Sequence, residues 1–189
     1  AAFYAGWPKA WATFGLAKQV WTEPSEEATT TTAQAAKAAA EGKADEAKAL
    51  ALKAAHEAET IFPIGEFNSG YAKYFSGDSF LYPVSTSQVG IYNVTFEPGC
   101  RNNWHVHEAK AGGGQILVVI SGEGYYQEFG KPAQRLKAGD VVNIPAGVKH
   151  WHGAAKDTWF SHLAVEVPGT ETANTWLEPV SDEDYNKLP

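Results

Sequence analysis

The stretch WHVHEAKAGGGQILVV, from Trp104 to Val119, places two histidines one residue apart, then a glycine-rich break, then Gln115 at the start of an apolar run. Side chains two residues apart on a strand point to the same face of the sheet, so His105 and His107 would direct two imidazoles toward one point. That arrangement suits a divalent first-row transition metal. A histidine taken alone is more often a structural hydrogen-bonding residue, so the pair needs support from other parts of the chain.

The surrounding region, residues 61–189, consists of short β-rich runs that glycine and proline interrupt. Examples are SFLYPV, QVGIYNVTFEPG, DVVNIPAG and TWFSHLAVEVPG. Many short strands with regular turn signals indicate a β-sandwich or a β-barrel. The segment SDEDYNKL, which begins at Ser181, is typical of a short helical turn with an acidic, serine-capped start.

A third histidine follows a tight turn later in the chain. In GDVVNIPAGVKH, Pro145 and Gly147 shape the turn immediately before His150. A barrel would bring His150 to the histidine pair, and Gln115 would add an amide oxygen. Four residues are therefore candidate ligands of one metal centre, with structural hydrogen bonding as the alternative for each histidine: His105, His107, Gln115 and His150.

Two sets of spacings support this centre, and through them the sequence resembles the cupin family. Five residues separate Gly99 from His105, and six separate Gln115 from Gly122, as in the first cupin motif. The positions of the second motif are also matched, by Gly139, Pro145, Gly147 and His150. The resemblance covers most of residues 61–189. It implies a mainly β fold, the cupin-type jelly-roll β-barrel, here with an N-terminal helical extension, and a bound divalent metal such as Mn, Fe, Zn, Ni or Co.

The chain departs from the cupin pattern at three positions. Seven residues, including Gly112–Gly114, separate His107 from Gln115 where the family has three or four, which implies a longer flexible loop that would act as a lid over the barrel mouth. Gln115 replaces glutamate, so neutral ligands would leave the metal its full +2 charge and make it a stronger Lewis acid. Ala154 replaces the final asparagine of the second motif. Glu108 is a weaker candidate for a substitute carboxylate, because strand alternation points it away from the face of His107.

Further identities lie toward the C-terminus, where KHWHGA begins at Lys149 and SHLA begins at Ser161. Both segments look like parts of small bacterial cupins that act as hydroxynitrile lyases. This resemblance implies that His162 lies near the metal and transfers a proton, with Tyr126 and His152 as further candidates. For His152, an outward-pointing structural role is the preferred alternative.

Substrate contacts are expected from three further residues. Arg101 and Asn103 share the strand parity of His105, so either would reach the barrel interior and contact an anionic substrate. Trp151 would form a wall of the substrate pocket, with a place in the core as the alternative. Cys100 has the opposite parity and is expected to be structural.

The expected function is that of a metal-dependent enzyme with lyase or decarboxylation-type chemistry on a small carbonyl or oxyanion-forming substrate, in which His162 moves the proton. An Fe- or Mn-dependent dioxygenase and a non-catalytic metal or small-ligand binding module are the alternatives. A requirement for O₂ separates the dioxygenase from the lyase. Because one fold hosts many chemistries, the fold does not choose between them.

Composition narrows the partners and the location. A net charge of −7 and an isoelectric point near 5.3 argue against nucleic acid as a partner, because no stripe of Lys and Arg offers a phosphate footprint. Cys100 is the one cysteine, which excludes an intrachain disulfide and a cysteine-based zinc site. No apolar run is long enough to cross a bilayer and no leader opens the chain, so we expect no membrane partner, a cytoplasmic location and a small-molecule substrate. The resemblance to small cupins and the exposed barrel edges predict a homodimer.

The first 60 residues differ in composition from the barrel. Residues 1–22 predict a helix that resembles the closing helix of the carboxymuconolactone decarboxylase family, whose catalytic residues are absent here. Its aromatic stripe is expected to pack on the barrel, on another subunit or on a domain absent from this chain. Residues 23–60 predict an alanine-rich helical spacer that is broken at Gly42, with His56 on its surface. The stripe consists of Trp7, Trp11, Phe14 and Trp21.

Overall fold

The computed structural model describes residues 26–188, and the chain divides into two compact units with the boundary after Ile61. The helix expected over residues 1–22, with its resemblance to carboxymuconolactone decarboxylases, lies outside the described residues. None of the helices between residues 26 and 188 combines the length and the hydropathy that a membrane span requires.

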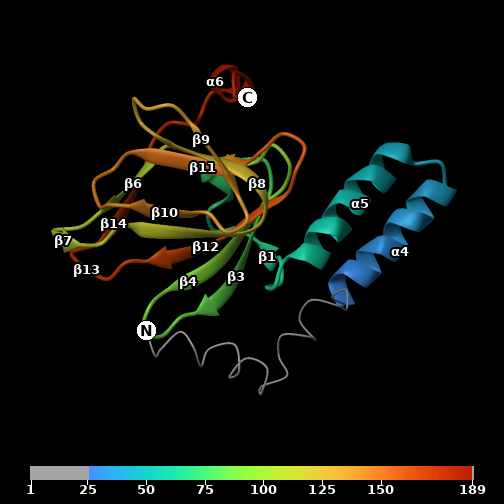
Figure 1. Cartoon of the computed structure of the whole chain (residues 1–189), viewed down its shortest axis with the longest axis horizontal. Helices are drawn as coiled ribbons and strands as arrows, with labels where there is room; N and C mark the ends of the chain where they lie inside the picture. Colours follow the sequence, from blue (N-terminus) through green and yellow to red (C-terminus); the bar gives the residue numbers. More distant parts are fainter. Residues whose placement is uncertain (1–25, 189) are drawn as a thin grey trace, which may run out of the picture. The chain divides into compact units, whose positions relative to one another are not determined.

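The described part of the smaller unit, from residue 26 onward, contains two helices, α4 (Glu26–Ala40) and α5 (Ala44–Glu59), drawn in blue and cyan in Figure 1. The turn between them includes Gly42 at a φ of +76°, so the helix break lies at the predicted residue, in a conformation that favours glycine. The surface position expected for His56 is wrong, since its exposed fraction is 4% and burial lowers its pKa to about 4. The alanine-rich sequence gives the two sides of α5 little contrast in hydropathy, so the buried side could not be recognised.

The larger unit, residues 62–188, is mainly β, as predicted, and its strands form one curled sheet and a separate two-stranded ribbon (Figure 1). The sheet has the order β1-β3-β4-β12-β8-β11-β5-β2; β9 and β10 also pair with β8, β6 pairs with β11, and β14 pairs with β6. The bounds of the elements are β1 Glu66–Phe67, the 3-10 helix η1 Ala72–Tyr74, β2 Phe75–Ser76, β3 Ser79–Ser85, β4 Ile91–Phe96, β5 Arg101–Asn102, β6 His105–Glu108, β7 Ala111–Gly112, β8 Gln115–Glu128, β9 Gln134–Lys137, β10 Val141–Ile144, β11 His150–Ala154, β12 Phe160–Glu166, β13 Gly169–Thr170, β14 Ala173–Trp176 and α6 Asp182–Asn186.

Strand β8 allows the sheet to curl because its two halves pair with different neighbours. The half that starts at Gln115 lies between β12 and β10, whereas the half that ends at Glu128 lies between β11 and β9. The change occurs near Gly122, which has a φ of +72°. A Cβ added at Gly122 would lie 1.8 Å from the Trp159 carbonyl oxygen, so both the conformation and the close approach require glycine.

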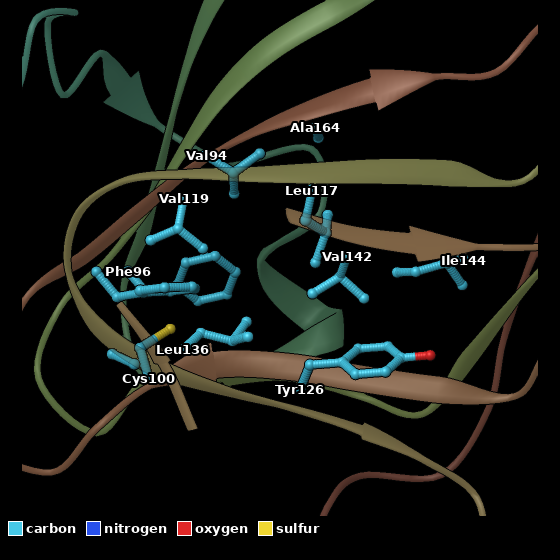
Figure 2. Packing of buried hydrophobic residues seen from close by; sticks show 12 residues of the cluster. Val94, Phe96, Cys100, Leu117, Val119, Tyr126, Leu136, Val142, Ile144 and Ala164 are labelled. Atoms are coloured by element: carbon cyan, nitrogen blue, oxygen red, sulfur yellow. The ribbon is translucent and has the colours of Figure 1, made fainter. Parts of the chain in front are cut away.

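The main core lies inside the curled sheet, where apolar side chains from β4, β8, β10 and β12 converge (Figure 2). Phe96 and Leu117 have exposed fractions of 0%, and burial of each such side chain contributes about 1.5–3 kcal/mol. Inward-facing positions alternate along β4 and β8, as the predicted strands require. The buried members of this cluster are Val94, Phe96, Cys100, Leu117, Val119, Tyr126, Leu136, Val142, Ile144, Ala154, Phe160 and Ala164.

A second apolar cluster covers the opposite face of β11. Trp151 packs there with Tyr185 of α6, at a ring-centroid distance of 6.2 Å. Helix α6 begins as predicted, because the Ser181 hydroxyl accepts a hydrogen bond from the Asp184 N–H at 3.0 Å. Since strand side chains alternate, an outward Trp151 places both of its chain neighbours on the inner face.

The glycine-rich connection before β8 is a hydrogen-bonded ribbon rather than the flexible lid expected from the sequence. Strand β7 pairs with β13, and the Gly113 N–H donates to the Pro168 carbonyl at 3.0 Å. The φ angles of Gly112, Gly113 and Gly114 are +63°, +73° and +92°, which L-residues with side chains rarely adopt. The lid expectation is therefore wrong, because backbone hydrogen bonds tie the connection to the segment after β12.

Candidate metal centre

Three histidines meet on the inner face of the barrel. Strand β6 contributes His105 and His107, and β11 begins at His150, whose Cα partner on β6 is His105. One ring nitrogen of each histidine lies within 4.8 Å of those of the other two. The turn before β11 fixes the arrangement, because the Gly147 N–H donates to the His107 carbonyl at 2.9 Å. The structure therefore brings the three predicted histidine ligands together.

Each of these imidazoles has its Nδ1 against an oxygen that can only accept. His105 Nδ1 lies 2.9 Å from the Asn103 carbonyl oxygen, and His150 Nδ1 lies 2.9 Å from the Val148 carbonyl oxygen. His107 Nδ1 lies 2.7 Å from the side-chain oxygen of Asn174. Each Nδ1 therefore carries the proton and donates, which leaves the lone pair of Nε2 free. Metal-binding histidines are held in this way in proteins, by an acceptor on the second ring nitrogen.

Buried polar atoms without partners mark the same place. Among the described residues, Nε2 of His107, Nε2 of His150 and Oε1 of Gln115 are buried and have no hydrogen-bond partner. Leaving such an atom unsatisfied costs on the order of 1–3 kcal/mol. A divalent cation would accept an electron pair from each of the three, so the donor set fits a first-row metal with Gln115 as the oxygen ligand.

Burial keeps the three imidazoles uncharged. It lowers the pKa of His150 to about 4 and the pKa of His105 well below its ordinary value. The pKa of His107 is also lowered, mainly by burial. At neutral pH all three rings are neutral, which is the protonation state that a metal ligand requires.

The centre opens into a cavity of about 300 Å³. His105, His107 and Gln115 line this cavity together with His152 and His162. The preferred sequence interpretation of His152 as an outward-pointing residue is wrong. His152 lies two residues after His150 on β11, so strand alternation directs both side chains inward.

His162 and His152 form a pair within the cavity. His162 Nε2 lies 3.2 Å from His152 Nδ1, and the His152 backbone N–H donates to the Asn102 side-chain oxygen at 3.0 Å. Burial lowers the pKa of His162 to about 4 and the pKa of His152 well below its ordinary value. The Nδ1 of His162 is buried and has no hydrogen-bond partner among the described residues. A neutral His162 in this position is able to accept a proton.

Two predicted residues lie outside the cavity lining. Tyr126 lies in the apolar core (Figure 2), with its ring centroid 5.8 Å from that of His150, and burial raises its pKa to about 12. The phenol therefore keeps its proton at neutral pH. Trp151 belongs to the outer cluster, where its indole N–H donates to the Gln127 side-chain oxygen at 2.8 Å. Trp151 thus packs in a core, which was the alternative interpretation.

Arg101 and Asn103 do not reach the cavity either. The Arg101 guanidinium pairs with the Asp182 carboxylate, donates to the Val180 carbonyl at 3.2 Å and lies 4.5 Å from the centroid of the Tyr185 ring. It therefore holds the C-terminal segment on the barrel, and the expected contact with an anionic substrate is not met. The Asn103 amide donates to the Leu177 carbonyl at 3.2 Å, while its own carbonyl orients His105.

Sequence reasoning missed two residues of β14 that support the centre. Asn174 is the Cα partner of His107, and Trp176 is the Cα partner of His105, on which its ring stacks at 4.6 Å. Both line the cavity. No local sequence signal identifies them, because their role depends on the pairing of two strands far apart in the chain. Glu108, the weaker ligand candidate, is exposed at the end of β6, as alternation predicts.

The barrel matches known proteins. A family model described as a cupin domain matches residues 92–166. The chain is 38% identical over 122 residues to an (R)-mandelonitrile lyase of Granulicella tundricola, a match that covers 62% of this chain and 90% of that protein. It also resembles a solved cupin-like protein from Thermotoga maritima, with 41% identity and a TM-score of 0.59, over 67% of this chain and 95% of that one. Glutelin type-A 1 of Oryza sativa subsp. japonica is 31% identical over 78 residues, which is 41% of this chain and 15% of the glutelin.

Proposed function

Because the chain belongs to the cupin family, we propose that its barrel is a metal-dependent lyase that cleaves a small hydroxynitrile-like adduct of a carbonyl compound. The observation that carries the proposal is the set of three histidines whose Nδ1 atoms all face carbonyl oxygens, which leaves three Nε2 lone pairs close together. The similarity to an (R)-mandelonitrile lyase supports the reaction class.

His105, His107, His150 and Gln115 would hold a divalent first-row metal, which supplies Lewis acidity toward a substrate oxygen or a cyanide-like group when bound. All four side chains are uncharged at neutral pH, so they do not offset the charge of such a cation. The acceptors behind the imidazoles do not offset it either, because each is a neutral carbonyl oxygen rather than a carboxylate.

His162 is the residue that we assign to proton transfer. His162 Nε2 lies 3.2 Å from His152 Nδ1, and in the tautomer whose Nε2–H donates to His152, the partnerless Nδ1 of His162 accepts the proton of the substrate hydroxyl. As the O–H bond breaks, its electron pair forms the second C–O bond of the carbonyl product. The C–C bond to the nitrile breaks at the same time, and cyanide leaves with the electron pair of that C–C bond and takes up the proton that His162 had accepted. His152 is a positioning residue, because its ring nitrogen holds the His162 ring at a distance of 3.2 Å.

Apolar side chains form much of the remaining cavity wall, among them Phe75, Leu81, Val94 and Trp176. These residues would exclude water and contact the apolar part of the substrate. A water-poor wall also strengthens the electrostatic stabilisation of the oxygen on which charge develops.

The test combines elemental analysis of the purified protein with an anaerobic assay of benzaldehyde release from mandelonitrile. We expect about one transition-metal ion per chain and activity without O₂. His162→Ala should keep the metal and lose most of kcat, whereas His150→Ala should lose both. Glu108→Ala is the matched control and should keep both. A metal-free but active protein would refute the metal assignment, and activity that depends on O₂ would favour a dioxygenase.

A further inference from the structure

Glu166 faces the same interior as the candidate centre. It ends β12, on which His162, Ala164 and Glu166 alternate toward one face, and it is the Cα partner of Gln115 on β8. Directly opposed residues of an antiparallel pair have neighbouring side chains on one face. A carboxylate therefore lies beside the amide that we assign as the fourth ligand.

The carboxylate lies where two hollows meet. The inner cavity of about 300 Å³ and an outer groove of about 460 Å³ share four lining residues. Glu166 is the one carboxylate that lines both, and Glu108 is a second that lines the groove. No Lys or Arg of the described chain lines either hollow. The shared residues are Tyr92, His107, Glu166 and Asn174.

The surroundings leave the charge of Glu166 unpaired. Among residues 26–188, no Lys or Arg forms an ion pair with Glu166. A Cβ added at Gly90 would lie 2.4 Å from Glu166 Oε2, so the absence of a side chain at Gly90 makes room for the carboxylate.

The inner cavity favours a ligand with polar groups, because Gln115 Oε1 and His162 Nδ1 are buried there without hydrogen-bond partners. We propose that Glu166 is a specificity-determining residue, which selects substrates with a protonated amine distal to the reacting carbon and rejects carboxylic acids. The reacting group occupies the inner cavity, and the ammonium group lies at the neck beside Glu166 with the outer groove beyond it. The proposal rests on the proposed function only in taking the inner cavity as the substrate site.

The test compares three probes of similar size and different charge. Binding of benzylamine, benzyl alcohol and benzoate is measured by NMR titration at pH 7, with and without Mn²⁺. We expect the metal-free protein to bind them in the order benzylamine, benzyl alcohol, benzoate. Glu166→Gln should weaken benzylamine about fivefold relative to benzyl alcohol, since one partly exposed ion pair contributes about 1 kcal/mol. Glu166→Asp keeps the charge and should keep the order.

Glu183→Gln is the matched control, because it removes the same charge from the exposed surface of α6, outside both hollows. It should leave all three affinities unchanged. An unchanged probe order in Glu166→Gln overturns the proposal, as does an equal shift in the control. If the order changes as expected but the protein neither binds metal nor cleaves mandelonitrile, only the proposed lyase function fails.

Discussion

Replacement of Asn174 by alanine tests whether the strand β14 supports the candidate metal centre. The Asn174 side-chain oxygen accepts the His107 Nδ1 proton at 2.7 Å, so the variant removes the one acceptor that orients this imidazole. Loss of such an acceptor typically lowers metal affinity about 10- to 100-fold, or by about 1.4–2.7 kcal/mol. Asn174 is exposed and His107 is half-buried, so water replaces part of the lost bond. We therefore expect the lower end of the range, about tenfold.

The assay is a competition titration of Zn²⁺ between the protein and a chromophoric chelator. Thr175→Ala is the control, because Thr175 is the exposed neighbour of Asn174 on β14 and points to the other face. Asn174→Asp keeps an acceptor oxygen and should bind Zn²⁺ at least as tightly as the wild type. If Asn174→Ala binds Zn²⁺ as tightly as Thr175→Ala does, the hydrogen bond does not orient the ligand and the reasoning fails.

Three further predictions concern the ligands, the pH dependence and the fold. His150→Ala should lose metal retention in elemental analysis and Glu108→Ala should keep it, and the opposite result would reassign the ligands. The pKa of His162 is about 4 in the fold and 6.5 ordinarily, so the unfolded chain binds more protons between these values. The metal-free protein should therefore lose stability as the pH falls from 6.5 toward 4, by roughly 3 kcal/mol from this group, and His162→Gln should flatten the urea-midpoint profile. Gly122→Ala should lower the free energy of unfolding by at least about 3 kcal/mol, because a Cβ there meets a carbonyl oxygen at 1.8 Å. Gly130 has a similar positive φ but lies in open space, so Gly130→Ala should lower it by about 1–2 kcal/mol, and urea denaturation of both variants measures the difference.

The sequence predicted those parts of the centre that depend on local spacing. His105 and His107 share a face because they lie two apart on one strand, and the turn at Gly147 leads into His150, which begins β11 opposite His105 of β6. The first relation is local, whereas the position of His150 needs the pairing of β6 with β11 and was expected from the motif spacings shared with cupins. The helix break at Gly42 is local as well and was predictable for that reason.

The alternation of side-chain directions gave a wrong prediction where residues outside any strand separate two strands. Arg101 was assigned the face of His105, but it belongs to β5, which ends at Asn102, and β6 begins only at His105. Alternation does not continue through the non-strand residues between them. The Arg101 side chain is instead fixed by Asp182, which lies far away in the sequence. Asn174, Trp176 and Glu166 were missed because their positions depend on long-range strand pairing, which no local pattern encodes.

The distribution of charge connects the metal proposal with the substrate proposal. His105, His107, His150 and Gln115 are neutral, so a bound dication would keep its full charge in a cavity where Glu166 is the one carboxylate among the described lining residues. An oxyanion that forms next to the ligands gains from this excess of positive charge. A substrate that already carries a carboxylate must pass Glu166, and between residues 26 and 188 no lysine or arginine lines the cavity or the groove to offset the repulsion. The same site therefore favours charge that develops during the reaction over charge that the substrate brings with it.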